Sequence, residues 1–203
     1  VVSAGNYGTN PQDVESNRVH AAGLIIRDLP MVASNFRSTA TLSEYLVTAG
    51  TVAIANIDTR QLTRQLRTQG AQNGCILALA DGESVTSAVV AKAVAAAKAA
   101  PSMAGLDLAQ VVSAKVSSQW TEAEWLLRSA DGKPGYGQQT APRFHVVAYD
   151  FGVKHNILRM LAQRGCKVTV VPAQTSAAEA LKHKPDGSYV TSADFQVEQR
   201  LRA

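Results

Sequence analysis

The residues with the clearest chemical potential surround Asp150-Phe151-Gly152, a triplet that ends an apolar run and precedes Lys154 and His155. An Asp-Phe-Gly triplet binds the metal ion in protein kinases. That site also needs a catalytic loop of the HRD type, a glycine-rich strand pair and a lysine on a strand. The sequence contains none of these, so a kinase site is not indicated.

A phosphate-binding loop is the second interpretation of the same residues. Neither GxxxxGK[ST] nor GxGxxG can be written around Gly152. We expect Gly152 to permit a sharp turn from strand to helix, with Lys154 and His155 exposed in the first helical turn. Asp150 ends the predicted strand, which leaves two roles open: it contributes to a ligand site at the edge of a parallel sheet, or its side chain caps the following helix. The capping role is favoured.

The two cysteines, Cys75 and Cys166, are the candidate nucleophiles. A strained nucleophile elbow needs small residues on both sides of the nucleophile, but Ile76 and Leu77 follow Cys75, and Lys167 follows Cys166. We expect both thiols to be small buried core residues.

The four histidines do not predict a metal site. No two of them share metal-ligand spacing, and neither cysteine pairs with another ligand. We expect one of them to alternate with core residues in a strand and the others to lie at the surface: His145 in the strand, and His20, His155 and His183 at the surface.

Composition narrows the class of protein. The net charge of +4 and the pI near 9.2 are mild, and basic residues are scattered, which disfavours nucleic-acid binding. No apolar run approaches the ~20 residues that cross a bilayer. Two cysteines make no disulfide framework, so a cytoplasmic location is expected. The chain starts at Val1 without Met or a signal-peptide pattern, which suggests a partial chain.

The first part of the chain predicts a mixed α/β domain over residues 1–127. Thr41 and Glu44 form a capping box, and Asp58 or Thr59 can cap the helix that Gly70 ends. An Ala-rich helix is stopped by Pro101. Strands are expected at residues 23–26, 52–57 and 75–79.

The second part begins after residues 128–143, which are rich in Gly, Pro and Gln and are expected to be a linker. Residues 144–149 and 168–171 read as buried parallel strands. Between them we expect a helix whose buried stripe is Ile157, Leu158 and Leu161. Ser176 and Glu179 make a second capping box, and Pro185-Asp186-Gly187 makes a turn. Residues 144–203 are therefore expected to open a doubly wound sheet with a βαβα unit.

Several long motifs occur in one order. They are "GNYGTN", "GLIIRDLP", "ASNFRSTATLSEYL", "IANIDTRQLTRQLRTQGAQNGCI", "GLDLAQVVS" and "VVAYDFGVKHNILRMLAQRGCKVTVVPAQTSA". Together they resemble the small, glutamine-hydrolysing subunit of bacterial carbamoyl phosphate synthases. The resemblance runs from about Gly5 to Gly187 and is interrupted near residues 80–101 and across the linker.

The resemblance implies an N-terminal α/β domain followed by a class I glutamine amidotransferase domain with a Cys-His-Glu triad. Ammonia from L-glutamine would pass through a tunnel to the large subunit. That partner would use ATP, bicarbonate and metal ions to make carbamoyl phosphate for arginine and pyrimidine synthesis. The Asp-Phe-Gly triplet would then mark the first βα turn of the amidotransferase domain.

The chain departs from the family pattern at both edges. "VVSA" stands where the family has a YPHI-like run, and residues 188–203 resemble neither the NGPGDP loop nor the GxCxGxQ elbow. No catalytic, glutamine-binding, cofactor-binding or metal-binding residue can be carried over, so this stretch alone is expected to be inactive. The alternative is a non-catalytic module that docks on the large subunit.

Overall fold

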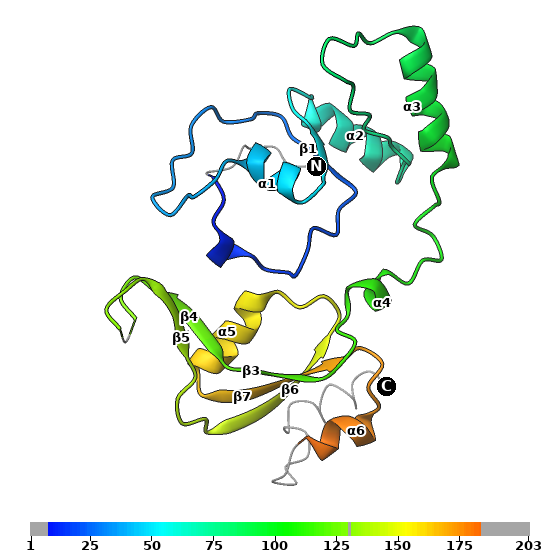
Figure 1. The fold of residues 1–203 in the computed structure, drawn as a ribbon. Helices are drawn as coiled ribbons and strands as arrows, with labels where there is room; N and C mark the ends of the chain where they lie inside the picture. The colour runs from blue at the N-terminus through cyan, green and yellow to red at the C-terminus, as the bar shows by residue number, and fades with distance from the viewer. Residues whose placement is uncertain (1–7, 130, 184–203) are drawn as a thin grey trace. The chain divides into compact units, whose positions relative to one another are not determined.

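A computed structural model describes residues 8–129 and 131–183, and the chain divides into two compact units, Val1–Leu106 and Asp107–Ala203 (Figure 1). The elements of the first unit, in order, are η1 (Pro11–Asp13), β1 (Gly23–Ile25), α1 (Leu42–Thr48), β2 (Val52–Ile54), α2 (Thr59–Gln69) and α3 (Ser87–Ala99). The expected turn at residues 185–187 and the divergent tail 188–203 lie outside the described residues.

The first unit is built on a parallel pair, in which Gly23 of β1 lies opposite Val52 of β2. A Cβ at Gly23 would approach the Val52 carbonyl oxygen to 3.2 Å and Ile76 Cδ1 to 2.9 Å, so glycine allows this close packing. The expected strands at residues 23–26 and 52–57 are confirmed in shorter form. Ile26 and Leu46 are the buried apolar side chains of this unit.

The helices of the first unit begin where the sequence predicts. The Thr41–Glu44 capping box is formed, with 2.7 Å from Thr41 N to Glu44 Oε2 and 3.2 Å from Glu44 N to Thr41 Oγ1. Asp58, the first of the two predicted candidates, caps α2 through a 2.9 Å bond from Gln61 N to Asp58 Oδ1. Short polar side chains thus satisfy backbone N–H groups that the helices leave unpaired.

Two expectations for this unit need correction or qualification. Residues 75–79 do not form a strand, because a strand needs a hydrogen-bonded neighbour and the β1–β2 sheet remains two-stranded within the described residues. The Ala-rich helix is confirmed as α3 and ends before Pro101, but none of its residues is buried.

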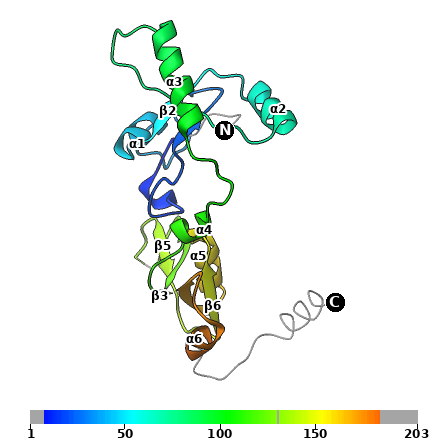
Figure 2. The same ribbon diagram turned by 90° about the vertical axis from the view of Figure 1, so that its right-hand side faces the viewer.

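The second unit contains, in order, α4 (Leu108–Val112), β3 (Ser118–Trp120), β4 (Glu122–Leu126), β5 (Gly135–Gln138), β6 (Phe144–Asp150), α5 (His155–Gln163), β7 (Cys166–Pro172) and α6 (Ala177–Lys182) (Figure 2). The predicted capping box of α6 is formed, with Glu179 N donating to Ser176 Oγ at 3.2 Å and Ser176 N donating to Glu179 Oε2 at 3.1 Å.

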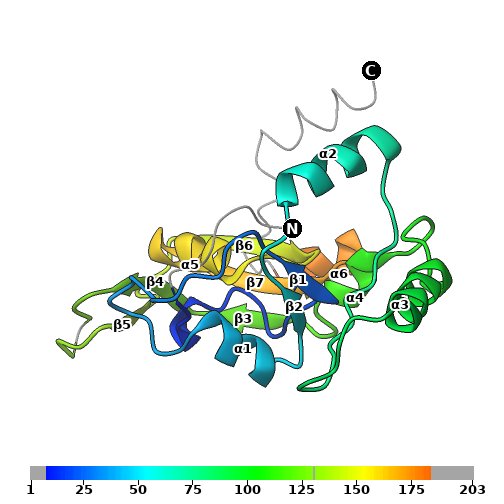
Figure 3. The same ribbon diagram turned by 90° about the horizontal axis from the view of Figure 1, so that it is seen from above.

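A three-stranded sheet in the order β3-β7-β6 organises the described part of the second unit. β6 and β7 are parallel over their whole length, from Phe144 opposite Cys166 to Asp150 opposite Pro172, whereas β3 is antiparallel to β7. α5 packs against β7 and beside β4 (Figure 3). Leu158, Val168 and Val170 form the centre of the core. The predicted β-α-β-α succession is confirmed.

The segment expected to be a linker, residues 128–143, contains β5, which pairs with β4 in an antiparallel hairpin. The division between compact units lies further upstream, between Leu106 and Asp107. Glycine and proline mark the turns of a hairpin as well as the course of a linker, so composition alone does not distinguish these two structures.

The buried face of α5 differs from the prediction. Leu158 is buried and Leu161 is half-buried, but Ile157 is 51% exposed. Arg159 and Ala162 are buried instead. The apolar stripe is displaced by about one residue because Arg159 finds a carboxylate and an aromatic ring on the neighbouring strands, which sequence periodicity does not record.

Candidate functional site

The carboxyl ends of β6 and β7 form the candidate site, because open parallel sheets bind their ligands at this edge. Asp150 and Pro172 end the two strands and lie opposite each other in the register. The segment from Ser113 to Lys115, which precedes β3, also reaches this edge. Three stretches distant in the sequence therefore meet here.

Asp150 acts as the centre of this arrangement. Its Oδ1 accepts hydrogen bonds from Gly152 N at 2.8 Å and Val153 N at 2.9 Å, and its Oδ2 accepts one from Ala114 N at 2.7 Å. The expected helix-capping role is wrong in its detail. Lys154 is the N-cap residue of α5, and it makes no side-chain capping bond. Asp150 instead fixes the βα turn and ties the pre-β3 segment to it.

Gly152 makes the turn that the sequence predicts. Its φ of 91° lies in the region that favours glycine. A Cβ at this position would stand 2.9 Å from Val112 Cγ2 at the end of α4. Glycine is thus required twice here, for backbone conformation and for the close approach of α4.

Ser113 closes the other side of the site. It is buried, its Oγ accepts a 2.9 Å hydrogen bond from Ala173 N, and the same hydroxyl donates to Ala114 O at 3.2 Å. Next to it lies a small cavity of about 140 Å³, whose lining is Gln110, Ser113, Ala114, Lys115, Pro172, Ala173 and Gln174. This lining includes no thiol, imidazole or carboxylate, so the cavity lacks all three side chains of the Cys-His-Glu triad that the resemblance implies.

The two cysteines lie away from this edge. Cys166 is half-buried at the amino end of β7, the opposite end from Pro172. Cys75, expected to be buried, is exposed, because residues 75–79 do not join a sheet. Within residues 8–129 and 131–183, neither thiol is hydrogen-bonded to a histidine.

The histidines are partly as expected. His145 lies in β6, where its Nε2 is 2.8 Å from Thr169 Oγ1, and His20 is exposed. His155 is half-buried against Trp120, with ring centroids 5.0 Å apart, and His183 is half-buried at the C-cap of α6, so the surface prediction is wrong for these two. Lys154 is exposed, as predicted.

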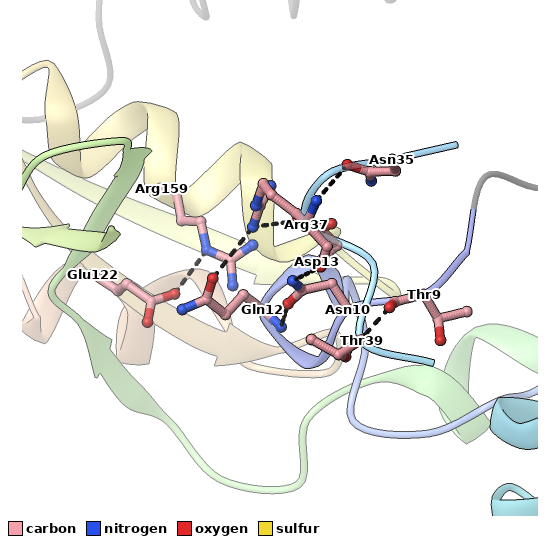
Figure 4. Close-up of polar contacts among 9 residues, drawn as sticks. All are labelled: Thr9, Asn10, Gln12, Asp13, Asn35, Arg37, Thr39, Glu122 and Arg159. Carbon is pink, nitrogen blue, oxygen red and sulfur yellow. Dashed lines mark hydrogen bonds and ion pairs between the residues drawn. The ribbon is translucent and has the colours of Figure 1, made fainter. Parts of the chain in front are cut away.

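Sequence reasoning missed the ion pair that joins α5 to β4. Arg159 Nε lies 2.7 Å from Glu122 Oε1 (Figure 4). The Arg159 guanidinium also lies over the Tyr136 ring, 4.0 Å from its centre. A buried arginine needs such partners. The only sequence signal was a charged residue inside an apolar helical pattern.

A second polar cluster holds the first unit together. Arg37 Nη2 lies 2.8 Å from Asp13 Oδ1, and Asn10 donates from its side chain to the Arg37 carbonyl (Figure 4). Arg37 N in turn donates to Asn35 Oδ1 at 2.9 Å. The bonds of Asn10 and Asp13 to Arg37 hold two irregular segments of the first unit next to each other.

The part of the chain that the structure describes holds no cluster of three or more His, Cys, Asp or Glu side chains placed to bind a metal ion. None of its helices combines the length and apolar character needed to span a membrane.

Comparison with known proteins gives two family matches in sequence order. Residues 1–76 match the carbamoyl-phosphate synthase small chain, CPSase domain, and residues 147–192 match glutamine amidotransferase class-I. The second match contains the end of β6 with Asp150, the turn at Gly152, α5 and β7.

Similar proteins include three named carbamoyl phosphate synthase small chain. The one from Rubrivivax gelatinosus is 63% identical over 93% of this chain and 48% of its own length. Those from Ralstonia nicotianae and Salmonella typhimurium are 57% and 54% identical, each over 93% of this chain and 47% of the relative. The chain thus spans about half the length of these relatives.

Proposed function

We infer a function from the premise that this chain belongs to the carbamoyl phosphate synthase small chain family, which is the family that its motifs resemble. We propose that it forms part of a glutamine-dependent synthase. In the whole protein, the amidotransferase domain would hydrolyse L-glutamine and pass ammonia to a large subunit. The large subunit would use ATP, bicarbonate and metal ions to form carbamoyl phosphate for arginine and pyrimidine synthesis in the cytoplasm.

One observation carries this proposal: the CPSase-domain match and the amidotransferase match lie on one chain and in order. The fold supports it, because a parallel β6–α5–β7 unit follows the first match and its opening turn is held by Asp150. In such a unit the carboxyl ends of the parallel strands form the edge where ligands bind, and the fold by itself does not determine the catalytic groups.

We propose that the present stretch does not hydrolyse glutamine. Covalent amide hydrolysis needs an activated nucleophile and donors for the oxyanion. The cavity beside Ser113 has neither a thiol nor an imidazole in its lining. The exposed Cys75 and the half-buried Cys166 have no histidine hydrogen-bonded to them within the described residues.

The test is ammonia release from glutamine by the purified chain, alone and mixed with the large subunit of a related synthase. We expect no hydrolysis above that of the buffer in either case, and we expect the mixture to elute as a complex in gel filtration. Hydrolysis that Cys75→Ala or Cys166→Ala abolishes would contradict the absence of catalytic groups. Failure to form a complex would contradict the proposed partner.

The alternative function is a docking module without catalysis. The cavity beside Ser113, whose lining includes no thiol or imidazole, favours it for this stretch. The two functions differ in the response to the rest of the relatives' amidotransferase domain. If that segment, added as a separate chain, restores glutamine hydrolysis, the enzymatic function is supported. If the chain still forms a complex with the large subunit but no glutamine is hydrolysed, the docking function is supported.

A further inference from the structure

An unpaired row of arginines runs along α2. Arg60, Arg64 and Arg67 follow one another at positions i, i+4 and i+7, which lie on one face of an α-helix. All three side chains are exposed. Throughout residues 8–129 and 131–183, none of their guanidinium groups has a hydrogen bond or an ion pair. We name these three residues the arginine face.

Elsewhere in the described residues, three arginines also have no carboxylate partner, namely Arg18, Arg128 and Arg143, and four others do have one. Arg27, Arg37, Arg159 and Arg164 each have a carboxylate within 4 Å: Asp28, Asp13, Glu122 and Glu124, respectively. α2 itself contains no aspartate or glutamate. The carboxylate of Asp58, just before the helix, is used as its N-cap.

The arginine face differs from these single unpaired arginines because its three cations lie on one side of one helix. Exposed helices commonly place opposite charges one turn apart, whereas like charges at i and i+4 repel. The arrangement on α2 brings three cations together and provides no anion of its own helix. A complementary anion from another molecule would remove this repulsion.

α2 presents this face away from its own unit. Its half-buried side chains are Leu62 and Leu66, on the opposite side of the helix, where they line a cavity together with Ile25 of β1 and Val52 of β2. Figure 2 shows α2 at the outside of the first unit. The leucine side thus anchors the helix, and the arginine side is free for a partner.

We propose that the arginine face docks on an acidic surface of a protein partner. Guanidinium groups bind carboxylates through two parallel hydrogen bonds, which gives arginine a geometric specificity that lysine lacks. The identification of that partner with the large subunit rests on the proposed function. A protein is favoured over nucleic acid because three cations neutralise at most three phosphates, fewer than the roughly six to ten contacts of strong duplex binders.

The experiment measures the dissociation constant between the whole chain and the large subunit of a related synthase, by calorimetry or surface binding. The test variant is R60E/R64E, and R60K/R64K keeps the charge but removes the guanidinium fork. The matched control is K92E/K98E, which makes the same number of charge reversals at exposed positions of α3 in the same unit. Circular dichroism checks that every variant stays folded.

We expect R60E/R64E to weaken binding by about tenfold or more at low salt, R60K/R64K to weaken it less, and K92E/K98E to change it by less than about twofold. Added salt should weaken binding of the unsubstituted chain more than that of R60E/R64E.

Unchanged affinity of R60E/R64E for the large subunit would overturn the docking role and leave the proposed function standing. If the same variant had lost the binding that the unsubstituted chain shows to a DNA duplex, the arginine face would be a nucleic-acid surface. If the unsubstituted chain did not bind the large subunit at all, the docking role and the proposed partner would both be overturned.

Discussion

Gly152 provides the sharpest prediction at the scale of single residues. Because its φ is 91° and a Cβ would lie 2.9 Å from Val112 Cγ2, Gly152→Ala should combine backbone strain with a steric clash. We expect a loss of about 2 kcal/mol or more in the free energy of unfolding, measured by urea denaturation.

Gly132→Ala is the matched control for this substitution. Gly132 has a similar φ of 78°, but a Cβ there would meet nothing within 4 Å. It should show the strain without the clash. The double variant G152A/V112A should recover part of the loss. If Gly152→Ala and Gly132→Ala cost the same, α4 does not pack closely on the turn.

Asp150 supports a second prediction at this scale. Asp150→Ala removes the acceptor of three backbone N–H groups, those of Gly152, Val153 and Ala114. We expect a loss of about 1–3 kcal/mol, since removal of the carboxylate leaves the partly buried N–H groups of Val153 and Ala114 without their acceptor. Amide hydrogen exchange should accelerate most at Ala114, which is 36 residues away in the sequence.

Asp28→Ala serves as the control, because the Asp28 side chain is 71% exposed and its one ion pair within the described residues is with the exposed Arg27, at 3.6 Å. Its effect should be within about 0.5 kcal/mol. If Ala114 kept its protection in Asp150→Ala, the carboxylate would not hold the pre-β3 segment.

At the scale of elements, the two capping boxes should make helix ends sensitive to pH. Hydrogen bonds from Thr41 lower the pKa of Glu44, and those from Ser176 lower the pKa of Glu179. A pKa that is lower in the folded state means that the carboxylate contributes stability above its unfolded pKa and loses it as the pH falls through the folded pKa. We expect fraying of the first turns of α1 and α6 on acidification, measured from the amide chemical shifts of Glu44 and Glu179.

Glu44→Gln tests this prediction. Glutamine can still close a capping box but does not titrate, so the acid-induced change at Glu44 should disappear while that at Glu179 remains. Persistence of the same pH dependence at residue 44 would show that another group causes it.

At the scale of the whole molecule, the second compact unit begins at Asp107 and includes β3. Trp120 at the end of β3 packs against the core of Leu158, Val168 and Val170. Trp120→Ala should therefore lower the free energy of unfolding by about 2 kcal/mol or more. Leu127→Ala, at a position 60% exposed, should change it by less than about 0.5 kcal/mol. Equal effects of the two substitutions would show that β3 does not belong to the core of the second unit.

The sequence alone determined the features that depend on neighbouring residues. A cap or a turn involves atoms only a few residues apart, so it can be predicted from the local sequence. This holds for the capping boxes at Thr41 and Ser176, the cap at Asp58, the glycine turn at Gly152 and the end of α3 before Pro101. The motifs also predicted the resemblance that the two family matches report, because several long segments occur in one order.

Only the tertiary structure decided which segments meet. Three features depend on groups that are distant in the sequence: the hydrogen bond from Ala114 to Asp150, the pairing of β3 with β7, and the burial of Arg159 beside Glu122. Cys75 is exposed because its segment finds no strand to pair with among the described residues. Periodicity gives the character of a face but not what lies against it. For this reason the elements could be predicted locally, whereas the division of the chain between Leu106 and Asp107 and the surroundings of the candidate site required the fold.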